Sequence, residues 1–115
     1  MTVREIRLFG DPVLRSPTAE VTDVGSVAGL VQDLLDTTAL PGRAGVAATQ
    51  IGVGLAVFSY NVDGKIGYLI NPEIVKLEGE PVLVEEGCLS VPGLWHRTPR
   101  HPKATARGYQ LDGSL

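Results

Sequence analysis

Glycine and proline residues divide this chain into short segments along its whole length. Fourteen glycines and eight prolines make up about a fifth of the 115 residues, against roughly 12% in average proteins. They follow no fixed period, which excludes a collagen-like fibre, and they leave little room for the long helices of a bundle. The pattern predicts a turn-rich globular protein, with residues 1–115 forming a single domain.

One stretch of the sequence has the period of an amphipathic helix. Residues 1–22 read as an extended lead-in, which Gly10-Asp11-Pro12 and Ser16-Pro17 break into turns. Asp23 then provides a suitable N-cap, and Pro41-Gly42 is expected to end the helix. Between them, apolar residues recur with helical spacing at Val24, Val27, Ala28, Val31, Leu34 and Leu35.

The helical period disappears after Gly45, where short and often β-branched segments follow. Asp63-Gly64 between two of them is a strong hairpin signal. The predicted strands are Val46–Gln50, Gly54–Asn61, Ile66–Ile70, Ile74–Leu77 and Pro81–Glu85. Strands this close together favour antiparallel sheets over βαβ units. The predicted fold class is therefore α+β, with short antiparallel β-sheets packed around an N-terminal amphipathic helix.

Charge and cysteine content narrow the setting of the protein. The net charge of −3 combines an acidic body with a weakly basic C-terminal segment, which does not indicate a direct nucleic-acid site. The first residues show no signal peptide, and the longest mostly apolar run, Ile51–Phe58, is far shorter than the roughly 20 residues that span a bilayer. A single cysteine suits a reducing compartment. We therefore expect a soluble, cytoplasmic protein without a membrane contact.

Two stretches of small residues could carry chemistry. In Gly45-Val46-Ala47-Ala48-Thr49-Gln50 the backbone is open to close approach and the Gln50 amide could donate to an oxyanion, although the alanines could simply seat a strand against the helix. In Glu86-Gly87-Cys88-Leu89-Ser90 the thiol could face a cleft or be a buried hydrophobe. A cysteine hydrolase, with His96 or His101 as the base for Cys88, is a further alternative.

The pair of stretches resembles the first two signature motifs of the peptide deformylases. The segment Gly10-Asp11-Pro12-Val13-Leu14-Arg15 is similar to that family's N-terminal segment. The resemblance implies a hydrolase that removes the formyl group from the initiator methionine of new polypeptides. It also implies a catalytic Fe²⁺, with Zn²⁺, Ni²⁺ or Co²⁺ as substitutes, and N-formyl-methionyl peptides as substrates. Transient contact with the ribosome is a further expectation.

Site roles follow from the same resemblance, residue by residue. Cys88 matches a metal ligand. The Gln50 amide and the Leu89 backbone N–H match the groups that stabilise the oxyanion. Ala44, Gly45 and Gly87 match positions that bind the substrate backbone, a form of strand addition that tolerates many sequences after methionine.

The sequence departs from the deformylase pattern at two places. Arg43 stands where the first motif usually has a glycine, either as an exposed loop arginine or as a contact for a passing peptide. The third motif of the family, His-Glu-x-x-His on a helix, is absent from the 115 residues, and Pro99 lies between His96 and His101.

From these departures we expect the N-terminal portion of a deformylase fold, without the helix that carries the third motif. Such a chain would be inactive by itself. A non-catalytic descendant that binds peptides or a partner is the alternative.

Overall fold

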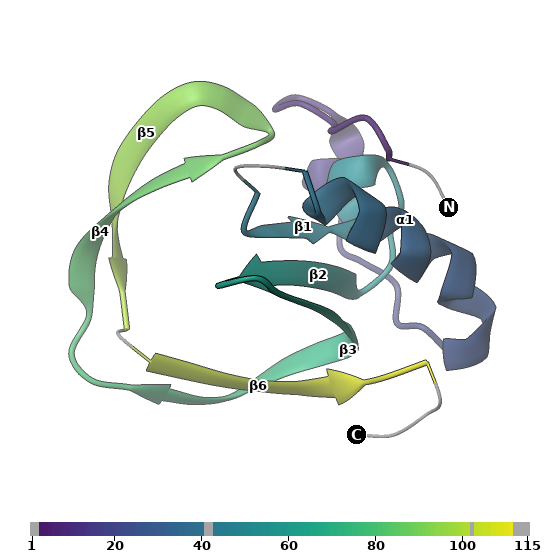
Figure 1. The fold of residues 1–115 in the computed structure, drawn as a ribbon. Coiled ribbons are helices and arrows are strands. Elements are labelled where there is room, and N and C mark those ends of the chain that lie inside the picture. Colours follow the sequence, from purple (N-terminus) through teal and green to yellow (C-terminus); the bar gives the residue numbers. More distant parts are fainter. Residues whose placement is uncertain (1–2, 41–42, 102, 112–115) are drawn as a thin grey trace.

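The computed structural model describes residues 3–40, 43–101 and 103–111 (Figure 1). A four-stranded antiparallel sheet has the order β1-β2-β3-β6, and a second sheet consists of β4 and β5 alone. The elements, with η for 3₁₀ helices, are η1 (Pro12–Leu14), η2 (Val24–Val27), α1 (Ala28–Thr38), β1 (Gly45–Ala47), η3 (Ala48–Ile51), β2 (Val57–Val62), β3 (Lys65–Glu78), β4 (Val82–Cys88), β5 (Val91–Arg100) and β6 (Lys103–Tyr109). The α+β prediction is confirmed.

The helix forms in two parts. Asp23 is the cap that the sequence predicts, because its carboxylate accepts from the Gly25 N–H at 3.1 Å, but it caps η2 rather than α1. The α-helix begins only at Ala28, after this turn of 3₁₀ helix, and Ala28 is exposed instead of joining the apolar stripe. The α-helix ends at Thr38, before the expected stop at Pro41-Gly42, which lies outside the described residues.

The core lies between α1 and the four-stranded sheet. The helix contacts β1, β2 and β3, and Figure 1 shows it beside β1 and β2. The buried apolar side chains come from the N-terminal lead-in, the helices and the strands, and they are Val21, Val27, Val31, Leu34, Val46, Ala48, Ile51, Val57 and Ile70. Ala48 is completely buried there, which agrees with a seating role for the small residues of the first motif.

Strand boundaries differ from the sequence prediction at several places, including the end of β4, which extends to Cys88 instead of Glu85. The predicted strand Val46–Gln50 is wrong in its second half, because η3 begins at Ala48. The predicted strand Gly54–Asn61 begins later, at Val57. The two strands predicted at 66–70 and 74–77 are one strand, β3, which continues through a bulge. The hairpin at Asp63-Gly64 is confirmed, with φ of 53° and 79° at the two residues.

The β4–β5 hairpin is a long arm inserted between β3, an inner strand of the main sheet, and the edge strand β6. It leaves after β3 and returns into β6, and its tip curves back towards the N-terminal lead-in (Figure 1). The residues after Ser90 form strand β5, which is not among the strands predicted from the sequence. This path brings the second motif, at the hairpin tip, to the first motif in η3.

Candidate functional site

The Gln50 side chain is held from both sides of its amide group. Its Oε1 accepts from the Ala47 N–H at 3.0 Å, within the turn that joins β1 to η3. Its Nε2 donates to Ser90 Oγ at 3.3 Å and lies 3.7 Å from Cys88 Sγ. The two motifs, 38 residues apart from Gln50 to Cys88, therefore meet at this amide.

The second motif forms the tip of the arm. Cys88 ends β4 opposite Val91, after an irregularity at Gly87, and its side chain is exposed. The interpretation of Cys88 as a buried hydrophobe is therefore wrong. Leu89 is half-buried against the main core, whereas Ser90 is only 4% exposed. The tip thus presents its thiol outwards while Leu89 and Ser90 anchor it.

The N-terminal lead-in connects both motifs through backbone hydrogen bonds. The Arg7 N–H donates to the Gln50 carbonyl at 2.6 Å, and the Phe9 N–H donates to the Ser90 carbonyl at 2.7 Å. In an extended segment the backbone N–H groups of residues two apart point in the same direction, so Arg7 and Phe9 can together hold η3 and the arm. Sequence reasoning missed this link and the part of Ser90, since neither has a local signature.

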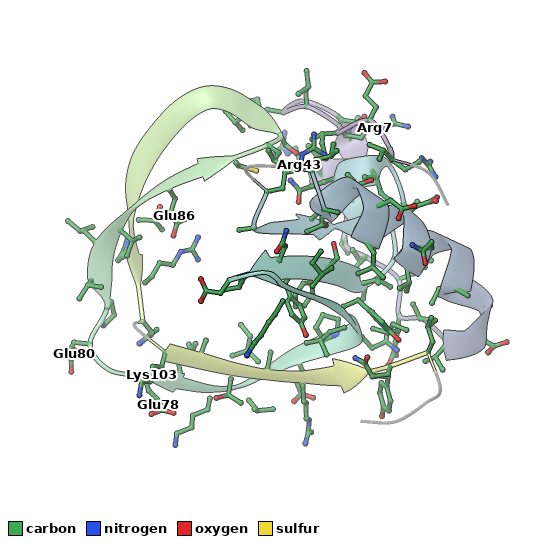
Figure 2. The ribbon with its side chains drawn as sticks, in the orientation of Figure 1. Arg7, Arg43, Glu78, Glu80, Glu86 and Lys103 are labelled. Carbon is green, nitrogen blue, oxygen red and sulfur yellow. The ribbon has the colours of Figure 1, made fainter. Side chains whose placement is uncertain are left out.

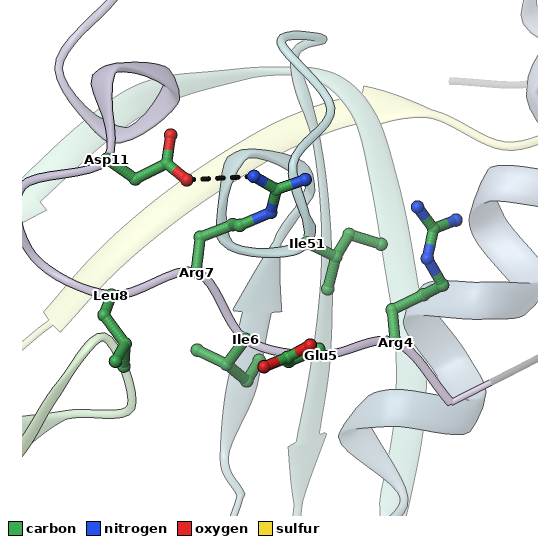
Figure 3. Close-up of a pocket in the computed structure, with 7 residues that line it drawn as sticks. All are labelled: Arg4, Glu5, Ile6, Arg7, Leu8, Asp11 and Ile51. Atoms are coloured by element: carbon green, nitrogen blue, oxygen red, sulfur yellow. Dashed lines mark hydrogen bonds and ion pairs between the residues drawn. The ribbon is translucent and has the colours of Figure 1, made fainter.

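An open pocket of about 570 Å³ lies beside this lead-in (Figure 3). Arg7 Nη1 donates to Asp11 Oδ2 at 3.0 Å, and the guanidinium lies over Gly52, where a Cβ would come within 2.8 Å of it. The Val13 N–H and then Arg7 hold the pKa of the Asp11 carboxyl below its usual value. The lining residues are Arg4, Glu5, Ile6, Arg7, Leu8, Asp11 and Ile51.

Strand β1 forms an edge of the main sheet among the described strands. The Asn61 N–H donates to the Ala44 carbonyl at 2.8 Å, so this carbonyl already has a partner in β2. Inward and outward backbone groups alternate along an antiparallel strand, so the N–H and C=O of Gly45 point to the open side. A Cβ at Gly45 would lie 3.1 Å from the Ser59 carbonyl oxygen, which favours glycine there. The edge can accept an added strand at Gly45.

Arg43 is not an exposed loop arginine, because its guanidinium is bound to the end of α1. Its side chain is half-buried, and Nη1 donates to the Thr37 carbonyl at 3.1 Å, in the last turn of α1. Figure 2 labels it near the place where the chain leaves the helix for β1.

His101 does not join the site as a base for Cys88. His101 follows the last residue of β5, at the base of the arm, and its Nδ1 lies 2.8 Å from the Gly79 carbonyl oxygen. Cys88 is at the other end of the same hairpin. His96 pairs with Glu86 in the ladder, and its side chain lies outside the described residues. Along a strand, His96 and His101 are about 16 Å apart, too far to share one ion.

Two further features concern the described residues alone. Among the side chains that the structure describes, which leave out residue 85 and residues 92–97, no three of His, Cys, Asp or Glu gather closely enough to hold a metal ion. No helix in the same part of the chain combines the length and apolar character needed to cross a membrane.

Comparison with known proteins places this chain in one family. The family model for polypeptide deformylase matches residues 3–115. The peptide deformylase of Acidothermus cellulolyticus is 48% identical over 114 residues, covering 98% of this chain and 63% of the relative. For that of Desulforudis audaxviator, identity is 44% over 115 residues, with 75% of the relative covered. The chain thus spans about two thirds of these relatives.

Solved structures give the same result. The peptide deformylase of Thermotoga maritima superposes with a TM-score of 0.91 at 30% identity, over 99% of this chain and 78% of that one. The Ehrlichia chaffeensis enzyme, solved in complex with actinonin, gives 0.89 at 31% identity, over 99% and 72% of the two chains. Fold, motifs and sequence agree, and the chain belongs to the polypeptide deformylase family.

Proposed function

We propose that residues 1–115 form a single domain that supplies the peptide edge, the thiol and the oxyanion donors of a peptide deformylase. The substrate is the N-formyl-methionyl end of a new polypeptide, and the reaction hydrolyses the formyl amide. The observation that carries this proposal is the meeting of Gln50 Nε2, Cys88 Sγ and Ser90 Oγ, next to the outward-facing backbone of Gly45.

The substrate backbone binds to β1 by strand addition. Gly45 supplies its outward N–H and C=O, Ala44 sets the register through its bond to Asn61, and Gly87 contributes backbone beside the formyl amide. Since main-chain groups make these bonds, the residues after methionine can vary widely.

Gln50 and Leu89 stabilise the negative oxygen that develops when the formyl carbon is attacked. The Gln50 amide is oriented before substrate arrives, because Ala47 and Ser90 hold its two ends. Its long contact to Cys88 is the one that a substrate oxygen replaces. The backbone N–H of Leu89, in the turn of the arm, is the second donor. Loss of one such donor typically lowers the rate by about 10²–10³.

Deformylases are metalloenzymes, and Cys88 is the ligand that this chain offers. A catalytic site needs about three protein ligands, and the described residues place no imidazole beside the thiol. The described part of the chain therefore does not fit a tightly held Fe²⁺, Zn²⁺, Ni²⁺ or Co²⁺ ion by itself. Its own contribution is peptide binding and oxyanion stabilisation. A cytoplasmic setting, with transient contact to the ribosome, agrees with a free thiol and a nascent-chain substrate.

Peptide titration of the 115-residue chain tests the proposal. Formyl-Met-Ala-Ser should shift the amide signals of Gly45 and Gln50, and Met-Ala-Ser should bind more weakly. Gln50→Ala should remove most of this difference, while Ser26→Ala, an exposed serine on η2, should not. Equal binding of both peptides would indicate the alternative, a peptide-binding descendant of the family that does not recognise the formyl group. No binding of either peptide would overturn the proposal.

Formate release measures catalysis separately, with and without each of the four metals. We expect little release by the chain alone. Release that Cys88→Ala abolishes would show that the chain supplies enough ligands.

A further inference from the structure

Arg43 joins two elements that meet at the peptide edge. The last carbonyls of an α-helix have no partner within the helix, and they form the negative end of its dipole. The last turn of α1 contains no basic residue of its own. Arg43, five residues beyond the end of α1, brings a guanidinium back to the Thr37 carbonyl. The cation that favours a helix C-terminus is thus supplied by a residue two positions before β1.

Asn61 makes the matching connection from β2. Its side-chain Nδ2 lies 3.5 Å from the Thr38 carbonyl oxygen, and its backbone N–H donates to the Ala44 carbonyl. The segment that enters β1 is therefore held on one side by β2 and, through Arg43, by the helix end. Gly45 follows directly, and its outward N–H and C=O are the groups assigned to the peptide.

We propose that Arg43 is a positioning residue for the peptide-binding edge, which it fixes by tying the entry of β1 to the last turn of α1. The expected effect on peptide binding rests on the proposed function. An edge that is already fixed loses less conformational entropy when a strand adds to it, so the peptide binds more tightly. A glycine at this position would leave the entry without this bond. The arginine thus makes the edge more rigid before the peptide binds.

The test compares Arg43→Ala and Arg43→Lys, with Arg15→Ala as a matched control on an exposed arginine. We expect Arg43→Ala to speed amide hydrogen exchange across Gly45–Ala47. It should also weaken binding of formyl-Met-Ala-Ser about two- to tenfold, the range that one hydrogen bond is worth. Lysine should restore much of both effects, since it can also donate to the Thr37 carbonyl. The control should match the original chain.

Three results would overturn the positioning role. The first is unchanged exchange at Gly45–Ala47 in Arg43→Ala. The second is faster exchange throughout the molecule with a lower Tm, which is the signature of a merely structural residue. The third is a local change in exchange without weaker peptide binding. If the original chain binds no formyl peptide, the proposed function fails, while the exchange data still decide whether Arg43 fixes the edge.

Discussion

Single residues in the core show how polar groups are placed behind the peptide edge. Ser59 and Thr38 are completely buried, and their hydroxyl groups hydrogen-bond to each other. The Ser59 hydroxyl also lies 3.2 Å from the Val46 carbonyl oxygen and 3.4 Å from that of Leu34. The helical stripe in the sequence does not include Thr38, because its burial depends on a partner 21 residues away. Apolar periodicity identifies the core face but cannot find such a pair.

Ser59→Ala should lower the free energy of unfolding by about 1–3 kcal/mol, because the buried Thr38 hydroxyl loses its partner. Urea unfolding measures this, with exposed Ser26→Ala as the control. The double variant Ser59→Ala/Thr38→Val should lose less unfolding free energy than the sum of the losses in the two single variants, since neither hydroxyl is then left without a partner. Strict additivity would contradict this account of the pair.

The Asp11 carboxyl should titrate below the usual pKa of an aspartate. The Val13 N–H contributes most and Arg7 adds to it. NMR titration of Arg7→Met should show a higher pKa that still lies below the ordinary value, because the backbone bond remains. Because the pKa is lower in the folded state, the ionised Asp11 carboxylate stabilises the fold at pH values above its unfolded-state pKa. This contribution disappears as the pH falls through the folded-state pKa. A pKa unchanged by Arg7→Met would exclude the ion pair as a cause.

At the scale of elements, β3 shows why local signals can mislead. Asn71-Pro72 is a typical stop signal, yet the strand continues through it. Asn71 has φ of 52°, and its side chain bonds to both the N–H and the carbonyl of Val21 at 2.8 Å. The register shift between Ile70 and Glu73 places the proline in a bulge, where a missing N–H is tolerated. The contact that sustains the strand comes from 50 residues away.

Two substitutions separate the roles of Asn71. Asn71→Gly keeps the backbone conformation and loses both side-chain bonds, so we expect a loss of about 1–3 kcal/mol in unfolding free energy. Asn71→Ala should cost roughly 1 kcal/mol more, because alanine is strained at positive φ. Asp63→Ala is a matched control for backbone strain, because Asp63 also has a positive φ, of 53°, but lies at an exposed turn. Urea unfolding that finds alanine no worse than glycine would show that the left-handed backbone is not maintained.

For the whole molecule, the sequence predicts one helix on antiparallel sheets and the two motifs, but not how the motifs meet. That meeting depends on the path of the arm and on the Arg7 and Phe9 bonds, which join residues far apart in the chain. The described apolar side chains of β4 are exposed, namely Val82, Leu83 and Val84. Among the described side chains and backbone, the contacts that hold the arm are its own ladder, the Arg100–Glu86 ion pair, the tip and the His101 contact at its base.

This unequal burial predicts unequal stability across the molecule. Amides of β2 and the first half of β3 should exchange with solvent only through global unfolding, because Val57, Ser59 and Ile70 lie in the core. Amides of β4 and β5 should exchange faster, through local opening of the arm. Hydrogen exchange followed by mass spectrometry measures both regions at once. Ser90→Ala removes the hydroxyl that accepts a hydrogen bond from the Gln50 amide, so it should speed exchange in the arm while leaving exchange in β2 unchanged. Equal protection of the arm and the main sheet would show that they unfold as one unit, and that the tip contacts add less than the ladder itself.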